Sequence, residues 1–166
     1  MELNFLVILG SALIPIFLGF LWYNPKLFGN VWMKAADMTE AKMEGANMPL
    51  IFGISFVLSV FLAFGMSQLV VHQTDILALF ISDPTFADNS SAAHQFYAEI
   101  MDRLGDKHRN FGHGVLHGAI LTIVVVLPVL GTNALFERKG FKYIAVNVGY
   151  WLVCLMLMGG VLCQFS

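Results

Sequence analysis

The chain has 166 residues, of which 58% are hydrophobic and only 12% are charged, and its mean hydropathy is +0.75. These values lie far from those of water-soluble globular domains and place the chain in the membrane class. The formal net charge is -2 and no long run of lysine and arginine exists, so the sequence lacks the basic surface that nucleic-acid binding requires. We therefore expect the lipid bilayer, and no nucleic acid, as its environment.

Four apolar stretches are each long enough to cross about 30 Å of hydrocarbon as a helix. No Asp, Glu, Lys or Arg interrupts their interiors. Backbone groups in lipid must be paired within the segment, and stretches of this length fit helices rather than barrel strands. The first stretch lacks the basic start and the cleavage site of a signal peptide, so we expect it to be retained. The sequence predicts an all-α, polytopic integral membrane protein, a single domain over residues 1–166, with four transmembrane helices at about 3–23, 49–71, 114–136 and 143–165.

The distribution of basic residues predicts the orientation. Lysine and arginine near the ends of spans resist translocation. The first and third connections carry six of these residues, whereas the longer second connection carries three. We therefore expect the first and third connections in the cytoplasm and both termini outward.

The first connection begins at Asn24-Pro25, which ends the first span. The following segment, 26–34, mixes aromatic residues with lysines and predicts an interfacial helix. Asn47 and Pro49 suit the N-terminal cap and first turn of the second span. Aromatic residues expected at the cytoplasmic headgroup level are Trp22, Tyr23, Phe28 and Trp32.

The second connection, about 72–113, is acidic and is expected to lie outward. Its apolar residues recur at helical spacing over 93–104, which predicts an amphipathic helix that is covered by the membrane surface or by another subunit. The second span is also free to continue past His72 as far as Phe80, because the first strong break is Asp83-Pro84. The role of the acidic stretch 74–109 does not follow from the sequence. The expected cap residues of the amphipathic helix are Asn89, Ser90 or Ser91 at its start and Gly105 at its end.

Three short motifs carry a resemblance to a known family. They are Gly19-x-x-Trp22-Tyr23-x-Pro25-x-x-Phe28-Gly29-x-x-Trp32, Thr132-Asn133-x-Leu135-Phe136-Glu137 and Asn147-x-Gly149-Tyr150-Trp151. Together they resemble the bacterial family of small membrane proteins catalogued as domain of unknown function 1761. The resemblance covers most of the chain outside the second connection. It implies a four-helix bacterial membrane protein and implies no activity. We expect this protein in the bacterial cytoplasmic (inner) membrane.

Histidines are the main candidates for chemistry, because ionisable groups in a membrane mark functional sites. His113 and His117 are four residues apart at the outward start of the third span, so they share one helix face about 6 Å apart. This pair suits a metal ion or a haem iron, with His108, His94 and Asp106 near enough in sequence to complete the ligand set. The alternatives are that these histidines cap the helix, bond to carbonyls or sense protons, while the adjacent glycines permit close helix packing.

Aromatic and amide residues form a second set of candidate functional residues. They either line a binding pocket between helices or pack and hydrogen-bond between helices to hold them together. Tyr150 and Trp151 lie about two turns inside the fourth span, so their polar atoms need partners there. Asn147 or Asn133 is expected to supply them, and packing is the favoured interpretation. The full set is Trp22, Tyr23, Asn133, Asn147, Tyr150 and Trp151.

Small residues follow a four-residue spacing along the second span and allow close approach of a neighbouring helix. Pro15 and Pro128 each interrupt a span midway and are expected to kink it. The residues of the small-residue stripe are Ser55, Ser59, Ala63 and Ser67.

No nucleotide-binding loop, catalytic triad or intramembrane carboxylate is present in the sequence. The leading hypothesis is therefore a non-enzymatic membrane protein that self-associates or serves as an accessory subunit of another membrane protein, with no cofactor predicted. The stripe and the amphipathic helix motivate it. The first alternative is a small-solute channel or transporter, and the second is a protein that binds metal or haem through His113 and His117.

Overall fold

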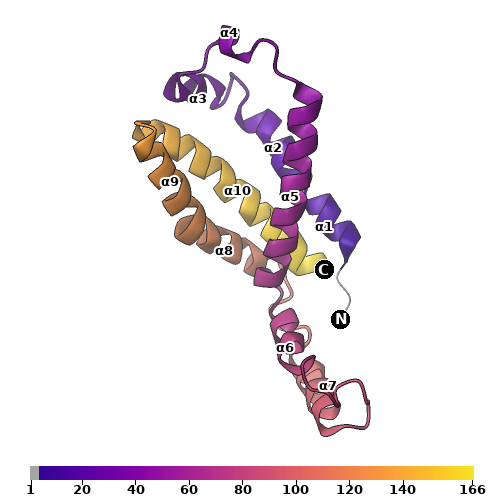
Figure 1. Cartoon of the computed structure of the whole chain (residues 1–166). Helices are drawn as coiled ribbons and strands as arrows, with labels where there is room; N and C mark the ends of the chain where they lie inside the picture. The colour runs from indigo at the N-terminus through magenta and orange to yellow at the C-terminus, as the bar shows by residue number, and fades with distance from the viewer. Residues whose placement is uncertain (1–3) are drawn as a thin grey trace.

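The computed structural model describes residues 4–166, and in this part of the chain all regular secondary structure is helical, with no strand. Figure 1 shows an elongated molecule in which a bundle of long helices carries a smaller protrusion at one end. The helices are α1 (Phe5–Ser11), α2 (Ile14–Trp22), α3 (Gly29–Ala36), α4 (Glu40–Met43), α5 (Met48–Val70), α6 (His72–Phe80), α7 (Ala92–Leu104), α8 (Phe111–Leu121), the π-helical turn η1 (Thr122–Val126), α9 (Leu127–Phe136) and α10 (Phe141–Phe165).

Four helical segments are long and apolar enough to cross a membrane, which confirms the predicted fold class: the chain is a multi-pass membrane protein. Their bounds are Phe5–Trp22, Met48–Val70, Phe111–Phe136 and Phe141–Phe165. Leu3, the predicted start of the first span, lies outside the described residues. The third span begins before the predicted Gly114, because the side chain of Asn110 caps α8 by accepting a hydrogen bond from His113 N.

Both mid-span prolines interrupt their helices, as the sequence predicts. Pro15 lies in the first turn of α2, and the span is divided there into α1 and α2. Pro128 follows η1, whose wider turn accommodates a residue that lacks an N–H and crowds the preceding turn.

Helices α8 and α10 pack backbone to backbone through glycines. A Cβ added to Gly114 would overlap the carbonyl of Gly159, and one added to Gly118 would overlap the carbonyl of Leu155. The glycines beside the two histidines of α8 therefore permit the close packing that their positions predict.

The core of the bundle lies where α5 meets α1 and α10. Ser59, Ala63 and Ser67 of the small-residue stripe are buried there, and Ser55 is partly buried. The stripe thus serves packing within this chain.

The first connection returns over one end of the bundle as α3 and α4 (Figure 1). Helix α3 confirms the helix predicted after Asn24-Pro25. Gly29 starts it against the carbonyls of Tyr23 and Asn24, which a Cβ would overlap. Lys139 Nζ donates a hydrogen bond to Ala36 O, so the third connection lies at the same end of the bundle.

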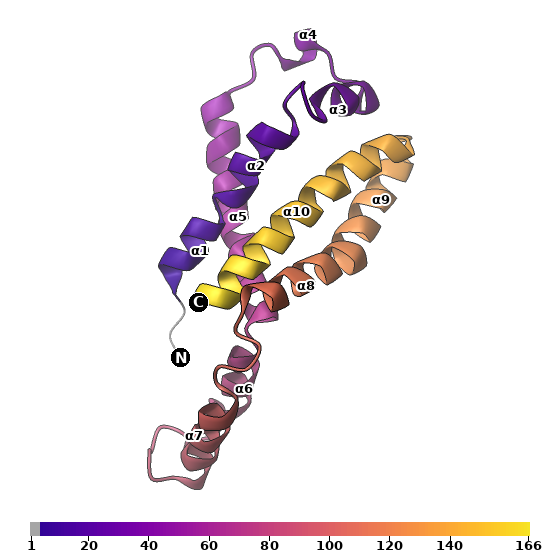
Figure 2. The same cartoon turned by 180° about the vertical axis from the view of Figure 1, so that it is seen from behind.

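The second connection forms the protrusion, seen at the bottom of Figures 1 and 2 as α6 and α7. Helix α7 confirms the predicted amphipathic helix and is capped by Ser91. Part of its apolar face packs on α6 of the same chain, where the Phe80 and Tyr97 rings lie 5.7 Å apart, whereas Phe96 of α7 is 57% exposed. Cover by the membrane surface or by another subunit stays a prediction. The second span does not run straight on to Phe80: α5 ends at Val70, and the non-helical Val71 separates it from α6.

Candidate metal centre

Three histidines converge at the neck of the molecule, which we define as residues 71–73 and 108–118, where the bundle meets the protrusion. The Nε2 atom of His113 lies 3.0 Å from that of His72 and 3.0 Å from that of His117. One ring nitrogen of each histidine lies within 4.8 Å of those of the other two. All three side chains are partly buried.

Local structure explains why these rings meet. His113 and His117 are one turn apart on α8, so they share a face of that helix. His72 is the first residue of α6, directly after the break at Val71. The chain leaves the bundle at His72 and returns to it at α8, which brings the third ring to the other two.

Polar contacts tie together the segments that carry the histidines. The buried side chain of Gln73 donates to the carbonyls of Leu104 at 3.1 Å and Lys107 at 2.9 Å. Cys163 Sγ on α10 lies 3.4 Å from Val70 O and 3.2 Å from His108 O. The start and the end of the second connection are therefore held to each other and to α10 by hydrogen bonds.

The other predicted ligands have different positions. The His108 ring stacks on that of His113, with centroids 4.7 Å apart, but His108 is exposed and is not one of the three converging residues. His94 lies on α7, where its Nδ1 is 3.1 Å from Phe86 O, so it is held within the protrusion. Asp106 is exposed and also stands outside the group.

His72 is not among the candidates drawn from the sequence, although a signal for it exists. A connection that leaves and re-enters one face of a membrane brings its two ends together. His72 and His113 are the residues at those two ends. Pairing the ends of each connection would have selected His72.

The chemistry of the three rings suits a cation. A neutral imidazole has one protonated and one unprotonated nitrogen. His113 Nε2 faces two other Nε2 atoms, so either one proton serves two acceptors or one lone pair serves two donors. A metal ion accepts one lone pair from each ring. Nitrogens bonded to a tetrahedral Zn²⁺ at about 2.0–2.1 Å lie about 3.3–3.4 Å apart, close to the separations from His113.

The aromatic set lies at the opposite end of the bundle and combines packing with a pocket. Tyr23 Oη donates to Asn147 Oδ1 at 3.0 Å, and Tyr150 Oη donates to Pro15 O at 2.6 Å. The partner of Tyr150 is thus a carbonyl of α2 rather than the predicted asparagine, and Asn133 is exposed on α9. Trp22 Nε1 donates to Val146 O at 3.1 Å.

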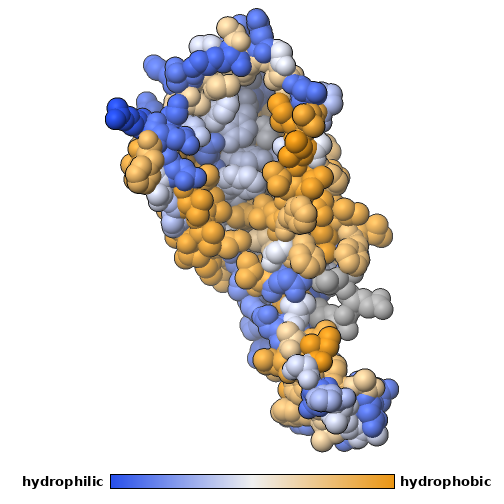
Figure 3. Space-filling view, in the orientation of Figure 1, coloured by the Kyte–Doolittle hydropathy of each residue, from blue (hydrophilic) through white to orange (hydrophobic). Residues whose placement is uncertain are grey.

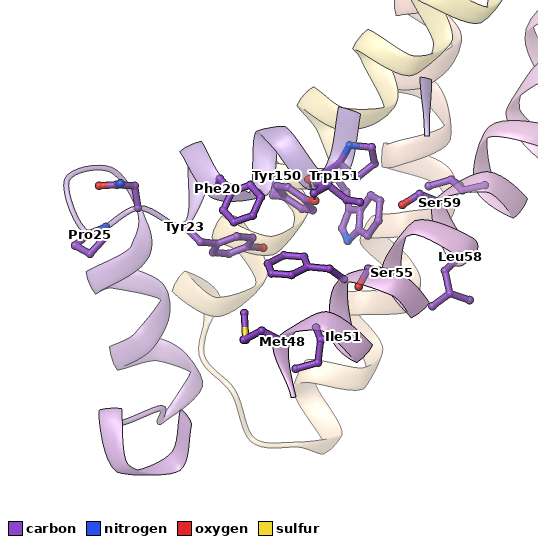
Figure 4. Close-up of a pocket in the computed structure, with 16 residues that line it drawn as sticks. Phe20, Tyr23, Pro25, Met48, Ile51, Ser55, Leu58, Ser59, Tyr150 and Trp151 are labelled. Carbon is purple, nitrogen blue, oxygen red and sulfur yellow. Dashed lines mark hydrogen bonds between the residues drawn. The ribbon is translucent and has the colours of Figure 1, made fainter. Parts of the chain in front are cut away.

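A pocket of about 690 Å³ lies beside these contacts, between α2, α5 and α10. Tyr23, Tyr150 and Trp151 line it from one side, and Ser55 and Ser59 line it from α5 (Figure 4). The sequence placed these serines only in a packing stripe, because a spacing on one helix does not show which neighbour stands opposite.

Comparison with known proteins gives a family and no function. No curated protein and no solved structure matches this chain. A family model described as "Protein of unknown function (DUF1761)" matches residues 6–163, which is nearly the whole chain and includes all three motifs. The chain therefore belongs to the DUF1761 family.

Proposed function

We propose that this protein binds one divalent transition-metal ion at the neck, through His72, His113 and His117. The observation that carries the proposal is the convergence of three ring nitrogens from two separate segments around a single point. Histidines that only capped a helix or bonded to carbonyls would have no reason to face one another.

A bare ion fits this arrangement better than haem. The Nε2 atoms of His72 and His117 each lie 3.0 Å from that of His113. Such separations suit ligands that share one small ion and leave no room for a porphyrin plane between two rings. Imidazole ligands favour zinc, copper, iron or nickel over magnesium or calcium. Three protein ligands also leave a fourth position open to water or another molecule.

The position of the ion gives it a mechanical role. His72 begins α6, which leads into the protrusion, whereas His113 and His117 belong to the bundle. An ion held by all three would fix the protrusion to the bundle. We further propose that the protein lies in the bacterial cytoplasmic membrane with both termini and the neck outward, as the excess of basic residues in the first and third connections favours.

The experiment is a metal titration of purified protein in lipid nanodiscs after treatment with a chelator. We expect the wild type to bind one Zn²⁺ per chain and His72→Ala and His113→Ala each to lose that binding. His94→Ala is the matched control, because His94 lies in the same connection but its ring contacts Phe86. Equal zinc binding by the wild type and His72→Ala would refute the proposal.

Self-association, an accessory-subunit role and the absence of enzymatic activity stay predictions. Two observations that motivated assembly have partial explanations within one chain: Ser59, Ala63 and Ser67 of the stripe are buried in the bundle, and α7 packs in part on α6. Metal binding does not depend on either outcome.

A further inference from the structure

The pocket at the end of the bundle remote from the neck is a second candidate binding site. Its lining is mainly apolar and aromatic, with the hydroxyls of Ser55 and Ser59 on one wall (Figure 4). Its volume of about 690 Å³ falls within the range typical of sites for small ligands, about 300–1,000 Å³. Figure 3 shows the hollow with a pale floor, strongly hydrophobic surface along the α5 side and mainly hydrophilic surface on the opposite side and above.

Hydrogen bonds keep the walls of this pocket in place. Tyr150 Oη binds Pro15 O, and Tyr23 Oη binds Asn147, so two contacts fasten the end of the first span to α10. Phe20 and Phe52, with ring centroids 5.1 Å apart, join α2 to α5. The space between α2, α5 and α10 is therefore bordered by aromatic side chains and stays open on one side.

The apolar surroundings of the pocket indicate that it suits the hydrocarbon chain of a lipid. Apolar residues that line it also face outward from the membrane spans: Phe20 is 59% exposed, Ile51 46% and Leu58 61%. Apolar cavities are poor sites for water, which needs several polar partners. An apolar pocket that borders the bilayer interior is accessible to lipid chains.

A positive charge near the rim of the pocket favours a lipid with a negatively charged headgroup. Asn24 and Pro25 line the pocket where the first span ends, and the next residue is the exposed Lys26. Lys26 N donates to Asn24 Oδ1 at 2.9 Å, which fixes this turn beside the pocket. Lys42 of the same connection is engaged by Asp37 at 2.8 Å. Lys26 therefore supplies a positive charge directly after the two residues that line the rim of the pocket.

We propose that this pocket binds one anionic phospholipid, with an acyl chain between α2, α5 and α10 and the phosphate beside Lys26. The shape and apolar lining select the chain, and the lysine at the rim favours a net negative headgroup over a zwitterionic one. The site is separate from the neck and does not require a metal ion.

Native mass spectrometry tests this proposal on the full chain, released from nanodiscs that contain equal amounts of phosphatidylglycerol and phosphatidylcholine. We expect the wild type to retain one phosphatidylglycerol. Ser55→Phe fills the pocket, and we expect it to weaken retention roughly tenfold, equivalent to about 1.4 kcal/mol. Ile54→Phe is the control, because Ile54 is 52% exposed on the same helix and does not line the pocket.

The headgroup is tested by Lys26→Gln, which we expect to remove the preference for phosphatidylglycerol while a lipid is still retained. Lys34→Gln, an exposed lysine on α3, should leave the preference unchanged. Equal retention by the wild type and Ser55→Phe, no retained lipid, or a bound molecule other than phospholipid would each overturn the proposal. Thermal unfolding of each variant confirms that it is folded.

Discussion

The two ends of the bundle are built from different side chains and leave spaces of different size between them. At the neck, glycines of α8 and α10 bring two backbones into contact, and three histidines meet beside them. At the opposite end, tyrosine and tryptophan hold α2 and α10 together by hydrogen bonds and leave a pocket of about 690 Å³ toward α5.

This difference shows how residue size sets the scale of a site in a small membrane protein. Without a hydrophobic driving force between helices in lipid, association depends on close packing and on polar contacts. Small residues give close packing and leave room only for an ion. Large aromatic residues with polar atoms join helices by hydrogen bonds at a greater separation and leave room for a small molecule.

The close contact at the neck is the feature that a substitution should damage most. In Gly118→Ala, the new Cβ would overlap the carbonyl of Leu155, so α8 and α10 must separate. We expect a loss of about 3 kcal/mol in the free energy of unfolding, at the upper end for overpacking. Thermal and denaturant unfolding in detergent would measure it.

Gly131→Ala is the control for that substitution, because nothing lies within 4 Å of a Cβ at Gly131 on α9. We expect it to leave the free energy of unfolding unchanged or slightly higher, since alanine favours helix over glycine. Equal losses in both variants would show that close packing of α8 on α10 is not what stabilises the neck.

Zinc should stabilise the folded protein through the three histidines. A ligand that binds only the native state at a concentration of 100 times its Kd adds about 2.7 kcal/mol to stability. We expect this gain in the wild type, measured as a zinc-dependent rise in Tm, and no gain in His113→Ala. A rise of the same size in His113→Ala would place the stabilising ion elsewhere.

A smaller effect is expected from the tyrosine contacts at the pocket end. Tyr150→Phe removes the hydrogen bond to Pro15 O and keeps the ring. We expect a loss of about 1 kcal/mol, the net value of one such bond, in detergent unfolding. Tyr97→Phe on α7 provides a comparison away from the pocket. If Tyr150→Phe were neutral, the hydrogen bond from Tyr150 to Pro15 O would not contribute to the stability of this end of the bundle.

Features that depend on local sequence were predictable. Length and apolarity identified the four spans, and the side chains of Asn47 and Ser91, both named from the sequence, accept hydrogen bonds that cap their helices. The cap at Asn110 was missed, and the third span therefore starts earlier than predicted. The i, i+4 spacing identified His113 and His117 as a pair on one helix face.

Features that depend on which segments meet in space were not. His72 is 41 residues from His113, and only the path of the second connection brings the two rings together. The contact of α7 with α6 was likewise not predictable, because the sequence presented α6 as an extension of the second span. Tyr150 donates a hydrogen bond to a backbone carbonyl. Every residue has such a carbonyl, so the sequence does not indicate which one Tyr150 meets.

The most direct test of the metal centre is the visible absorption spectrum of the nanodisc protein loaded with one equivalent of Co²⁺, in the wild type and in His72→Ala. We expect the intense bands of a four-coordinate Co²⁺ ion with imidazole ligands in the wild type, and their loss in His72→Ala. Spectra that are the same in both proteins, or the weak bands of hydrated Co²⁺ in the wild type, would contradict it.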